Sequence, residues 1–278
     1  QAKCLFKPHG VMAVLGPFNF PAHLPNGHII PALAMGNTVV FKPSDKAPAV
    51  GQLLVELFDE ALRTAGAPAG GINLVQGGVD VAGALVNHDG LDAVAFTGSW
   101  PVARRITEAN LDRPGRILAL ELGGSNPAVV LNDADVKLAA IEIARCAFNT
   151  TGQRCTCTRR AIIQRAIAPK MIPAICQIAS QLVIGHPRAS HPVFMGPLVT
   201  DASRRHLLQF QDRAAKAGAS VLVAARAVEL AAGVDGQQTE GGYFVSPSII
   251  EVERFTAAAP APLDGTVAFD PGCDEEVF

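Results

Sequence analysis

The sequence has little charge, few aromatic residues and no long apolar run. Charged residues make up only 17% of the chain, and the formal net charge is −2 without a basic cluster. The sequence therefore has no basic patch that could bind the phosphates of a nucleic acid. Gly, Pro or a charged residue interrupts every apolar stretch before it reaches the roughly 18 residues of a membrane span. The opening residues lack the pattern of a secretory signal peptide. We therefore expect a cytoplasmic protein with neither a nucleic-acid nor a membrane partner.

Cysteine is also scarce. Six cysteines in 278 residues are too few for a disulfide framework. Cys155 and Cys157 have no matching second pair at zinc-ligand spacing, so we expect no metal. Apolar residues, in contrast, are abundant at 49%, which excludes disorder as the overall state. The length fits about two domains, or one large α/β domain.

Short apolar runs alternate with helical patterns along the first half of the chain. The expected strands are 38–42, 72–75, 93–97 and 117–122, and the expected helices are 49–65, 79–86 and 101–111. Nearly all-apolar strands in such an alternation predict a parallel sheet that helices cover on both faces. The fold class is therefore α/β, with a doubly wound parallel sheet.

The organisation changes at Gly123-Gly124, where we place a boundary between domains 1–123 and 124–278. The second domain is expected to be α/β as well, with strands at 127–131, 160–164, 220–224 and 244–252 and helices at 135–149, 169–182 and 200–217. Segments 231–242 and 257–272 have no periodicity and are rich in Gly and Gln or in Ala and Pro. They predict flexible surface insertions.

Polar residues follow two of the expected strands at their carboxyl ends, where doubly wound folds bind ligands. Lys42 ends strand 38–42 and is followed by Ser44 and Asp45, and Ser99 follows strand 93–97. Taken singly, Lys42 could be a solvated charge and Ser99 a helix N-cap. Together they suit a dinucleotide, with a pyrophosphate at a helix N-terminus and an acid for ribose hydroxyls. Gly78 could permit close backbone approach or form a plain turn, and the G-x-G-x-x-G fingerprint is absent.

Cys155 stands out among the cysteines because it follows Gly152-Gln153-Arg154 at the end of an expected helix. A cationic side chain and oriented backbone N–H groups can lower the pKa of a thiol, and the thiolate is the reactive species. Burial is the default interpretation for any single cysteine, and Cys157 keeps it. We predict that Cys155 is a catalytic nucleophile.

Two further residues could assist a nucleophile. Glu121 closes strand 117–122 beside two glycines, where burial without a partner would be costly. It is either a partnered structural carboxylate or, with a raised pKa, a general base for water. Asn19 lies between two prolines, either as a turn residue or as a rigidly held amide of the kind that an oxyanion hole requires.

Taken together, six segments resemble the aldehyde dehydrogenase superfamily in their residues, order and spacing. They are Gly16-Pro17-Phe18-Asn19-Phe20-Pro21, the run 36–44, Phe96-Thr97-Gly98-Ser99, Glu121-Leu122-Gly123-Gly124, the run 148–155 and Glu275-Glu276-Val277-Phe278. Within the superfamily, runs 16–33 and 152–160 are most similar to the succinylglutamate semialdehyde dehydrogenases of arginine catabolism.

The resemblance implies oxidation of a small-molecule aldehyde to a carboxylic acid. Cys155 would form a thiohemiacetal and then a thioester with the substrate. The Asn19 amide and the Cys155 N–H would hold the oxyanion, and Glu121 would activate the hydrolytic water. The substrate would be N-succinylglutamate 5-semialdehyde, with another aldehyde or semialdehyde as the alternative. Transfer of the acyl group to coenzyme A is a further alternative, against which Glu121 weighs.

The resemblance also implies a nicotinamide cofactor. The cofactor-binding residues would be Lys42, Ser44, Asp45, Gly78, Ser99, Glu276 and Phe278. Of these, Lys42 and Asp45 would meet the adenosine ribose and Ser99 the pyrophosphate, with Glu276 and Phe278 on the nicotinamide side. The charge of Asp45 near the ribose 2′-hydroxyl favours NAD over NADP.

Members of the superfamily extend beyond both ends of this chain. We therefore expect a piece of a longer, homo-oligomeric protein, with part of the NAD-binding domain missing before residue 1 and part of the catalytic domain missing after residue 278. The isolated chain is expected to be poorly active and to associate through exposed apolar edges, or to be an inactive remnant.

Overall fold

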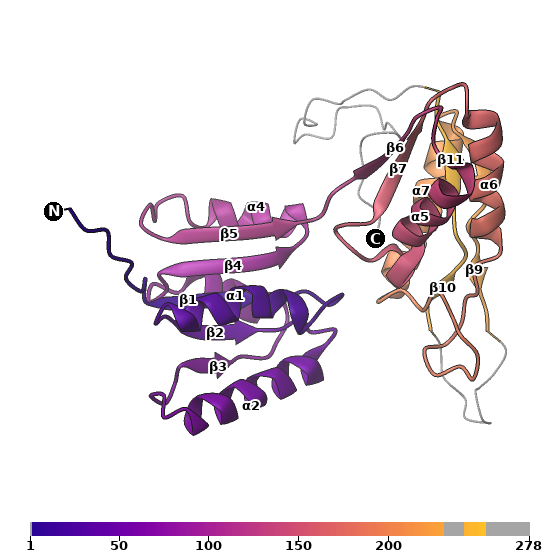
Figure 1. Cartoon of the computed structure of the whole chain (residues 1–278). Coiled ribbons are helices and arrows are strands. Elements are labelled where there is room, and N and C mark those ends of the chain that lie inside the picture. The colour runs from indigo at the N-terminus through magenta and orange to yellow at the C-terminus, as the bar shows by residue number, and fades with distance from the viewer. Residues whose placement is uncertain (1, 231–241, 254–278) are drawn as a thin grey trace. The chain divides into compact units, whose positions relative to one another are not determined.

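The computed structural model describes residues 2–230 and 242–253. It divides into two compact units, residues 1–123 and 124–278, and the division falls at Gly123-Gly124 (Figure 1). The expected insertions 231–242 and 257–272 lie outside the described residues apart from Gly242. Within the described ranges, no helix is long and apolar enough to cross a membrane.

Unit 1 is a five-stranded parallel sheet with helices on both faces, so the expected doubly wound α/β fold is confirmed. The strand order is β3-β2-β1-β4-β5. The elements are β1 (Val11–Leu15), α1 (His23–Ala34), β2 (Thr38–Lys42), α2 (Pro48–Thr64), β3 (Ile72–Leu74), α3 (Val79–Asn87), β4 (Ala93–Gly98), α4 (Trp100–Glu108) and β5 (Ile117–Leu122).

The central strand and the first helix are the elements that the sequence pattern missed. β1 is short, and α1 contains Pro25 and Pro31, of which Pro31 lies in the helix interior. Proline removes a helical hydrogen bond and usually ends a helix, which conceals the pattern. Tertiary packing overrides this preference, because Pro25, Ile29 and Ala32 are buried against the sheet.

Two core clusters lie on opposite faces of the sheet, as the alternation of strand side chains requires. Ala13 and Leu15 of β1 pack on one face with residues of α3 and α4. Val14, from the same strand, packs on the other face with Phe41 of β2 and with residues of α1 and α2. Each helix pair therefore covers one face, and β1 is buried from both sides.

β1 pairs in parallel with β2 on one side and with β4 on the other. The chain passes from β1 to β2 and later returns across β1 to β4, which makes a topological switch point at their carboxyl ends. Ligands of open α/β sheets bind at such a point. Asn19 follows β1 and Ser99 follows β4, and Glu121 in β5 pairs with Thr97 of β4.

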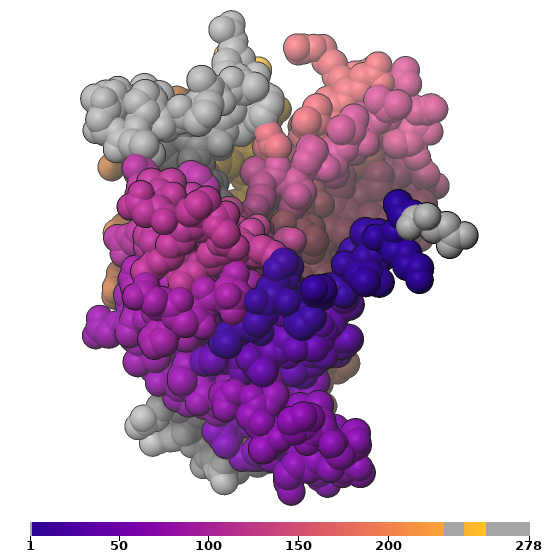
Figure 2. All heavy atoms as spheres, turned by 90° about the vertical axis from the view of Figure 1, so that its left-hand side faces the viewer, coloured from indigo at the N-terminus to yellow at the C-terminus, as the bar shows by residue number. Residues whose placement is uncertain are grey.

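The segment before β1 extends away from the sheet (Figure 1), and the space-filling view shows it in indigo (Figure 2). Leu5 and Phe6 in this segment are exposed. The segment is tied down where β1 begins, because the side-chain oxygen of Asn37 accepts hydrogen bonds from the backbone N–H groups of His9 and Gly10.

Unit 2 contains three two-stranded sheets and three α-helices among its described residues. The elements are β6 (Asn126–Val130), α5 (Val136–Phe148), the 3₁₀ turn η1 (Asn149–Gly152), β7 (Thr158–Ile163), α6 (Ala168–Ser180), α7 (Asp201–Lys216), β8 (Ser220–Val223), β9 (Ala227–Val228), β10 (Phe244–Val245) and β11 (Ile249–Glu251). β6 and β7 are parallel, whereas β8 pairs with β11 and β9 with β10 in antiparallel fashion.

The expected strand 244–252 is in fact two strands that pair with different partners, β10 with β9 and β11 with β8. Ser246 breaks the run between them, because its hydroxyl accepts a hydrogen bond from the Arg226 N–H. The core of this unit joins Val130 of β6 with residues of α5 and α6, including Ile143 and Met171.

Replacement of Phe41 by Ala is expected to lower the free energy of unfolding of unit 1 by about 3–5 kcal/mol, because its side chain is fully buried and leaves a cavity. Leu57→Ala is the matched control, since Leu57 is 55% exposed and its loss should change stability by less than about 0.5 kcal/mol. Trp100, the single tryptophan of the chain, lies in this unit and reports its urea unfolding by fluorescence. Equal midpoints for the two variants would contradict the assignment of the core.

Candidate active site

The loop after α5 bends sharply because three consecutive residues adopt left-handed backbone conformations. Thr150 has φ 58°, Thr151 has φ 56° and Gly152 has φ 72°. Glycine reaches this region freely, but a β-branched residue there costs about 1–2 kcal/mol. Such strain persists only where surrounding contacts hold it, and it is concentrated at functional sites.

Two buried side chains provide those contacts. Thr151 and Gln153 are each 7% exposed. The Thr151 hydroxyl donates to the Gly196 carbonyl at 2.9 Å. The Gln153 amide nitrogen donates to the Thr150 carbonyl at 3.2 Å and the Pro197 carbonyl at 3.3 Å, and its oxygen accepts from the Val199 N–H at 2.9 Å. The loop is therefore fixed to segment 196–199.

Cys155 occupies the first corner of a turn at the end of this loop. The Cys157 N–H closes the turn by donating to the Arg154 carbonyl at 3.3 Å. Cys155 is half-buried, whereas Cys157 is fully buried, so the packed position expected of Cys157 is confirmed. Of the two cysteines, Cys155 is the one that a substrate could reach.

The side chain of Arg154 extends from this turn toward the end of α5. Its terminal nitrogen is 3.5 Å from the Cys146 carbonyl in the last helical turn, where a cation complements the helix dipole. Its Nε is buried and has no hydrogen-bond partner among the described residues. Arg154, the cationic residue next to Cys155 in the sequence, therefore contacts the last turn of α5.

Two residues that the sequence analysis did not select hold the backbone around Cys155. The Asn126 side-chain amide donates to the Cys155 carbonyl at 2.6 Å and to the Cys157 carbonyl at 2.9 Å. The Arg159 guanidinium donates to the Gly152 carbonyl at 2.8 Å. The sequence signal for Asn126 was its place two positions after the Glu121-to-Gly124 motif, and nothing in the spacing marked Arg159.

Asn19 and Glu121 belong to unit 1, whereas Cys155 belongs to unit 2. The Asn19 side-chain oxygen accepts from the Phe20 N–H at 3.0 Å, a local bond typical of Asn in turns. Glu121 is exposed because β5 is an edge strand of the sheet. Burial lowers the pKa of His28 on α1, and the negative charge of Glu121 partly offsets that shift, so the two side chains interact.

Lys42 is a buried residue and not a solvated charge. It is 7% exposed, and its ammonium group donates to the carbonyls of Pro43 and Gly77, each at 2.7 Å. Burial lowers its pKa, and the charge of Asp45 partly offsets this. Lys42 thus joins the carboxyl end of β2 to the glycine pair before α3, which brings Lys42, Asp45 and Gly78 into one region.

Asp45 itself is half-exposed and pairs with Lys46 at 2.9 Å. The hydrogen bond from Lys46 lowers the pKa of Asp45, so the carboxylate is ionised. Ser44 accepts from the Lys46 N–H at 3.2 Å. The ammonium group of Lys46 therefore partly balances the negative charge of Asp45, the residue expected to meet the adenosine ribose.

Ser99 is the N-cap residue of α4 in extended conformation, but its side chain makes no capping hydrogen bond. Pro101 lies in the first turn and has no backbone N–H, so this turn has one fewer N–H group without a hydrogen-bond partner in the helix. An uncapped helix N-terminus directly after β4, at the switch point of the sheet, fits the pyrophosphate of a dinucleotide. Glu276 and Phe278 lie outside the described residues.

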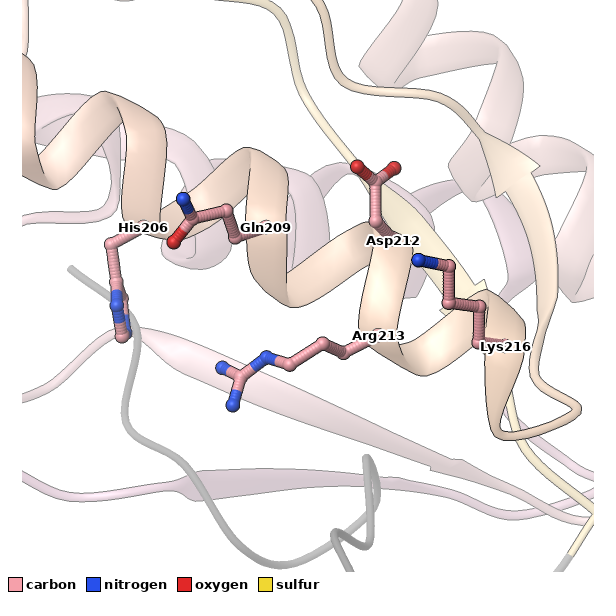
Figure 3. Close-up of a pocket in the computed structure, with 5 residues that line it drawn as sticks. All are labelled: His206, Gln209, Asp212, Arg213 and Lys216. Carbon is pink, nitrogen blue, oxygen red and sulfur yellow. The ribbon is translucent and has the colours of Figure 1, made fainter.

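A shallow hollow lies along one face of α7 (Figure 3). Its lining residues are His206, Gln209, Asp212, Arg213 and Lys216. None of the expected catalytic or cofactor-binding residues lines it, and its side chains all come from a single helix. No group of His, Cys, Asp and Glu residues suited to a metal ion occurs in the ranges 2–230 and 242–253.

Replacement of Thr150 by Gly is expected to stabilise the chain by up to about 1 kcal/mol, because relief of strain outweighs the added freedom of the unfolded chain. Thr151→Gly is the matched control, since it relieves the same strain but loses the hydrogen bond to Gly196, worth about 1 kcal/mol. Thermal unfolding followed by circular dichroism measures both. If Thr150→Gly is no more stable than Thr151→Gly, this account of the loop is wrong.

Comparison with known proteins places this chain in one family. Residues 2–261 match the aldehyde dehydrogenase family. The chain is 49% identical over 249 residues to N-succinylglutamate 5-semialdehyde dehydrogenase 2 of Caulobacter vibrioides, which covers 88% of this chain and 48% of that protein. The chain spans about half the length of the curated relatives it matches.

Solved structures agree with this result. Glyceraldehyde-3-phosphate dehydrogenase GapN from Methanocaldococcus jannaschii, complexed with NADP, has a TM-score of 0.78 at 30% identity and covers 89% of this chain and 51% of its own. PnpE in complex with nicotinamide adenine dinucleotide has a TM-score of 0.78 at 35% identity and covers 88% and 48%. The resemblance expected from the six sequence segments is confirmed, and the chain belongs to the aldehyde dehydrogenase family.

Proposed function

We propose that this chain carries the catalytic residues of an NAD-dependent dehydrogenase that oxidises N-succinylglutamate 5-semialdehyde to N-succinylglutamate. The observation that carries the proposal is the Cys155 loop, whose strained backbone is held by buried hydrogen bonds and presents one thiol. The substrate follows from the name of the Caulobacter relative. In this proposal the protein is a cytoplasmic homo-oligomer of arginine catabolism.

The chemistry begins at Cys155. Its thiolate attacks the carbonyl carbon of the aldehyde, and the negative charge that develops on the carbonyl oxygen is stabilised by the Asn19 amide and the Cys155 N–H. A bound nicotinamide supplies the oxidising power by accepting a hydride. A thioester on Cys155 remains. Glu121 then takes a proton from water, which attacks the thioester carbon, and the acid leaves as the Cys155 thiolate returns.

The cofactor would lie at the switch point of unit 1. Ser99 and the N-terminus of α4 would hold the pyrophosphate, and the region of Lys42, Asp45 and Gly78 would meet the adenosine ribose. We propose NAD as the cofactor because Asp45 is ionised and repels a 2′-phosphate. The pairing of Asp45 with Lys46 makes this preference moderate.

Replacement of Cys155 by Ala is expected to abolish NADH formation from N-succinylglutamate 5-semialdehyde, because no other side chain supplies the nucleophile. Cys157→Ala is the matched control, two positions along, and should retain most activity because Cys157 is fully buried. The assay follows absorbance of NADH with the complete gene product that contains this chain. Full activity of Cys155→Ala would remove the proposed mechanism.

The substrate and the cofactor are tested separately with the same protein. The expected kcat/KM is higher for N-succinylglutamate 5-semialdehyde than for aliphatic aldehydes, and higher with NAD than with NADP. Product analysis with and without coenzyme A distinguishes hydrolysis from acyl transfer, and hydrolysis alone is expected. Preference for an aliphatic aldehyde would overturn the substrate and leave the reaction class standing.

A further inference from the structure

We propose that Asn126 is a positioning residue for the nucleophile, because its side-chain amide fixes the backbone of the turn that carries Cys155. This inference rests on the proposed role of Cys155. It concerns contacts within unit 2 alone. Asn126 acts through its hydrogen bonds to the carbonyl groups of Cys155 and Cys157.

Both donor hydrogens of the Asn126 amide are used in this clamp. The nitrogen lies 2.6 Å from the Cys155 carbonyl oxygen and 2.9 Å from the Cys157 carbonyl oxygen, and both bonds are partly buried. A side-chain amide has two N–H donors in one plane, so the two carbonyls must lie in a fixed relation to each other. A hydroxyl has a single donor and could hold one of them.

The clamp lies where the β6–β7 pairing is irregular. Asn126 pairs with Thr158, and the register then shifts between Asn126 and Pro127. Pro127 has no N–H to donate to a neighbouring strand. The Asn126 side chain supplies hydrogen bonds at the place where the backbone ladder is interrupted, directly before β7 begins.

Gly124, two residues before Asn126, lies beside the clamp. A Cβ placed on Gly124 would lie 3.4 Å from the Asn126 side-chain oxygen and 3.6 Å from the Cys155 carbonyl oxygen. Both distances correspond to van der Waals contact. The glycine pair that ends the Glu121 motif therefore passes close to the clamped turn.

The clamp has a chemical consequence for the proposed oxyanion site. The Cys157 N–H and the Arg159 guanidinium both donate to the Arg154 carbonyl, at 3.3 and 3.5 Å. In a trans peptide the N–H points opposite to the carbonyl, so these contacts aim the Cys155 N–H away from them. Asn126 holds the next peptide unit, and the two together restrict the backbone on both sides of the Cys155 side chain.

The test uses Asn126→Leu, which keeps the approximate volume and removes both donors, and Asn126→Ser, which keeps one. Misplacement of a catalytic group by about 1 Å can cost about 100-fold. We expect kcat of Asn126→Leu to fall by about 10- to 100-fold with little change in KM, and Asn126→Ser to be intermediate. A KM effect alone, or an unchanged kcat in both variants, would overturn the proposal.

Asn73→Leu is the matched control. The Asn73 amide also donates to two carbonyls, those of Val39 at 3.4 Å and Gly70 at 2.9 Å, but it lies in unit 1 and has no role in the proposed chemistry. It should leave kcat near the wild-type value in protein that remains folded. An equal loss of kcat in Asn73→Leu would show a general effect of losing such a clamp, and the positioning role would be wrong.

A second measurement separates this inference from the proposed function. Alkylation by iodoacetamide, quantified for each cysteine by mass spectrometry, compares Cys155 with the exposed Cys4 in the same molecule. We expect the ratio of the Cys155 rate to the Cys4 rate to change in Asn126→Leu and to stay constant in Asn73→Leu. If no aldehyde yields NADH, the proposed function is wrong, but the positioning role of Asn126 is then decided by the alkylation ratio alone. The positioning role is wrong if the ratio of alkylation rates is unchanged in Asn126→Leu.

Discussion

The left-handed turn at Thr150, Thr151 and Gly152 is the constraint on which the proposed chemistry of Cys155 depends. Two threonines in this conformation store strain that the local sequence cannot relieve. Buried hydrogen bonds from Thr151 and Gln153 to segment 196–199 offset it. A loop held in this way has little freedom to change its backbone conformation. The thiol at its end is therefore preorganised, which is what a nucleophile in a defined oxyanion site requires.

Unit 1 combines an apolar sheet with polar groups that could bind a polar ligand. β1 is buried on both faces and fixes the switch point between β2 and β4. Lys42, Ser44, Asp45 and Ser99 lie at the carboxyl edge of this sheet. Lys42 is the informative case, because a buried ammonium whose pKa is lowered would destabilise the fold without its two carbonyl partners. Its position joins two loops at the edge where a dinucleotide would bind.

Much of this arrangement was predictable from residue patterns, and the exceptions have physical causes. The alternation of apolar runs and helical periods gave the parallel sheet, but prolines concealed α1 and with it the reason to assign β1. The motif before Cys155 indicated a turn at Gly152, and the structure shows Gly152 in a left-handed conformation. No periodicity could reveal the left-handed threonines or the clamp of Asn126, because both arise from contacts with residues distant in sequence. The sequence indicated that Glu121 would be costly only if it were buried without a partner, and on the edge strand β5 it is exposed.

The stretch from Glu121 to Asn126 connects the two units along the chain. It begins with the proposed base, passes the Gly123-Gly124 division between the units and ends at the residue that holds the Cys155 turn. A chain segment of this length spans at most about 18 Å when fully extended. The covalent path therefore limits the distance between Glu121 and Asn126. Asn126 is in turn bound to the backbone of the Cys155 turn by two hydrogen bonds. In the proposed mechanism Glu121, at one end of this stretch, activates the water, and Asn126, at the other end, positions the backbone of Cys155 for the attack on the carbonyl.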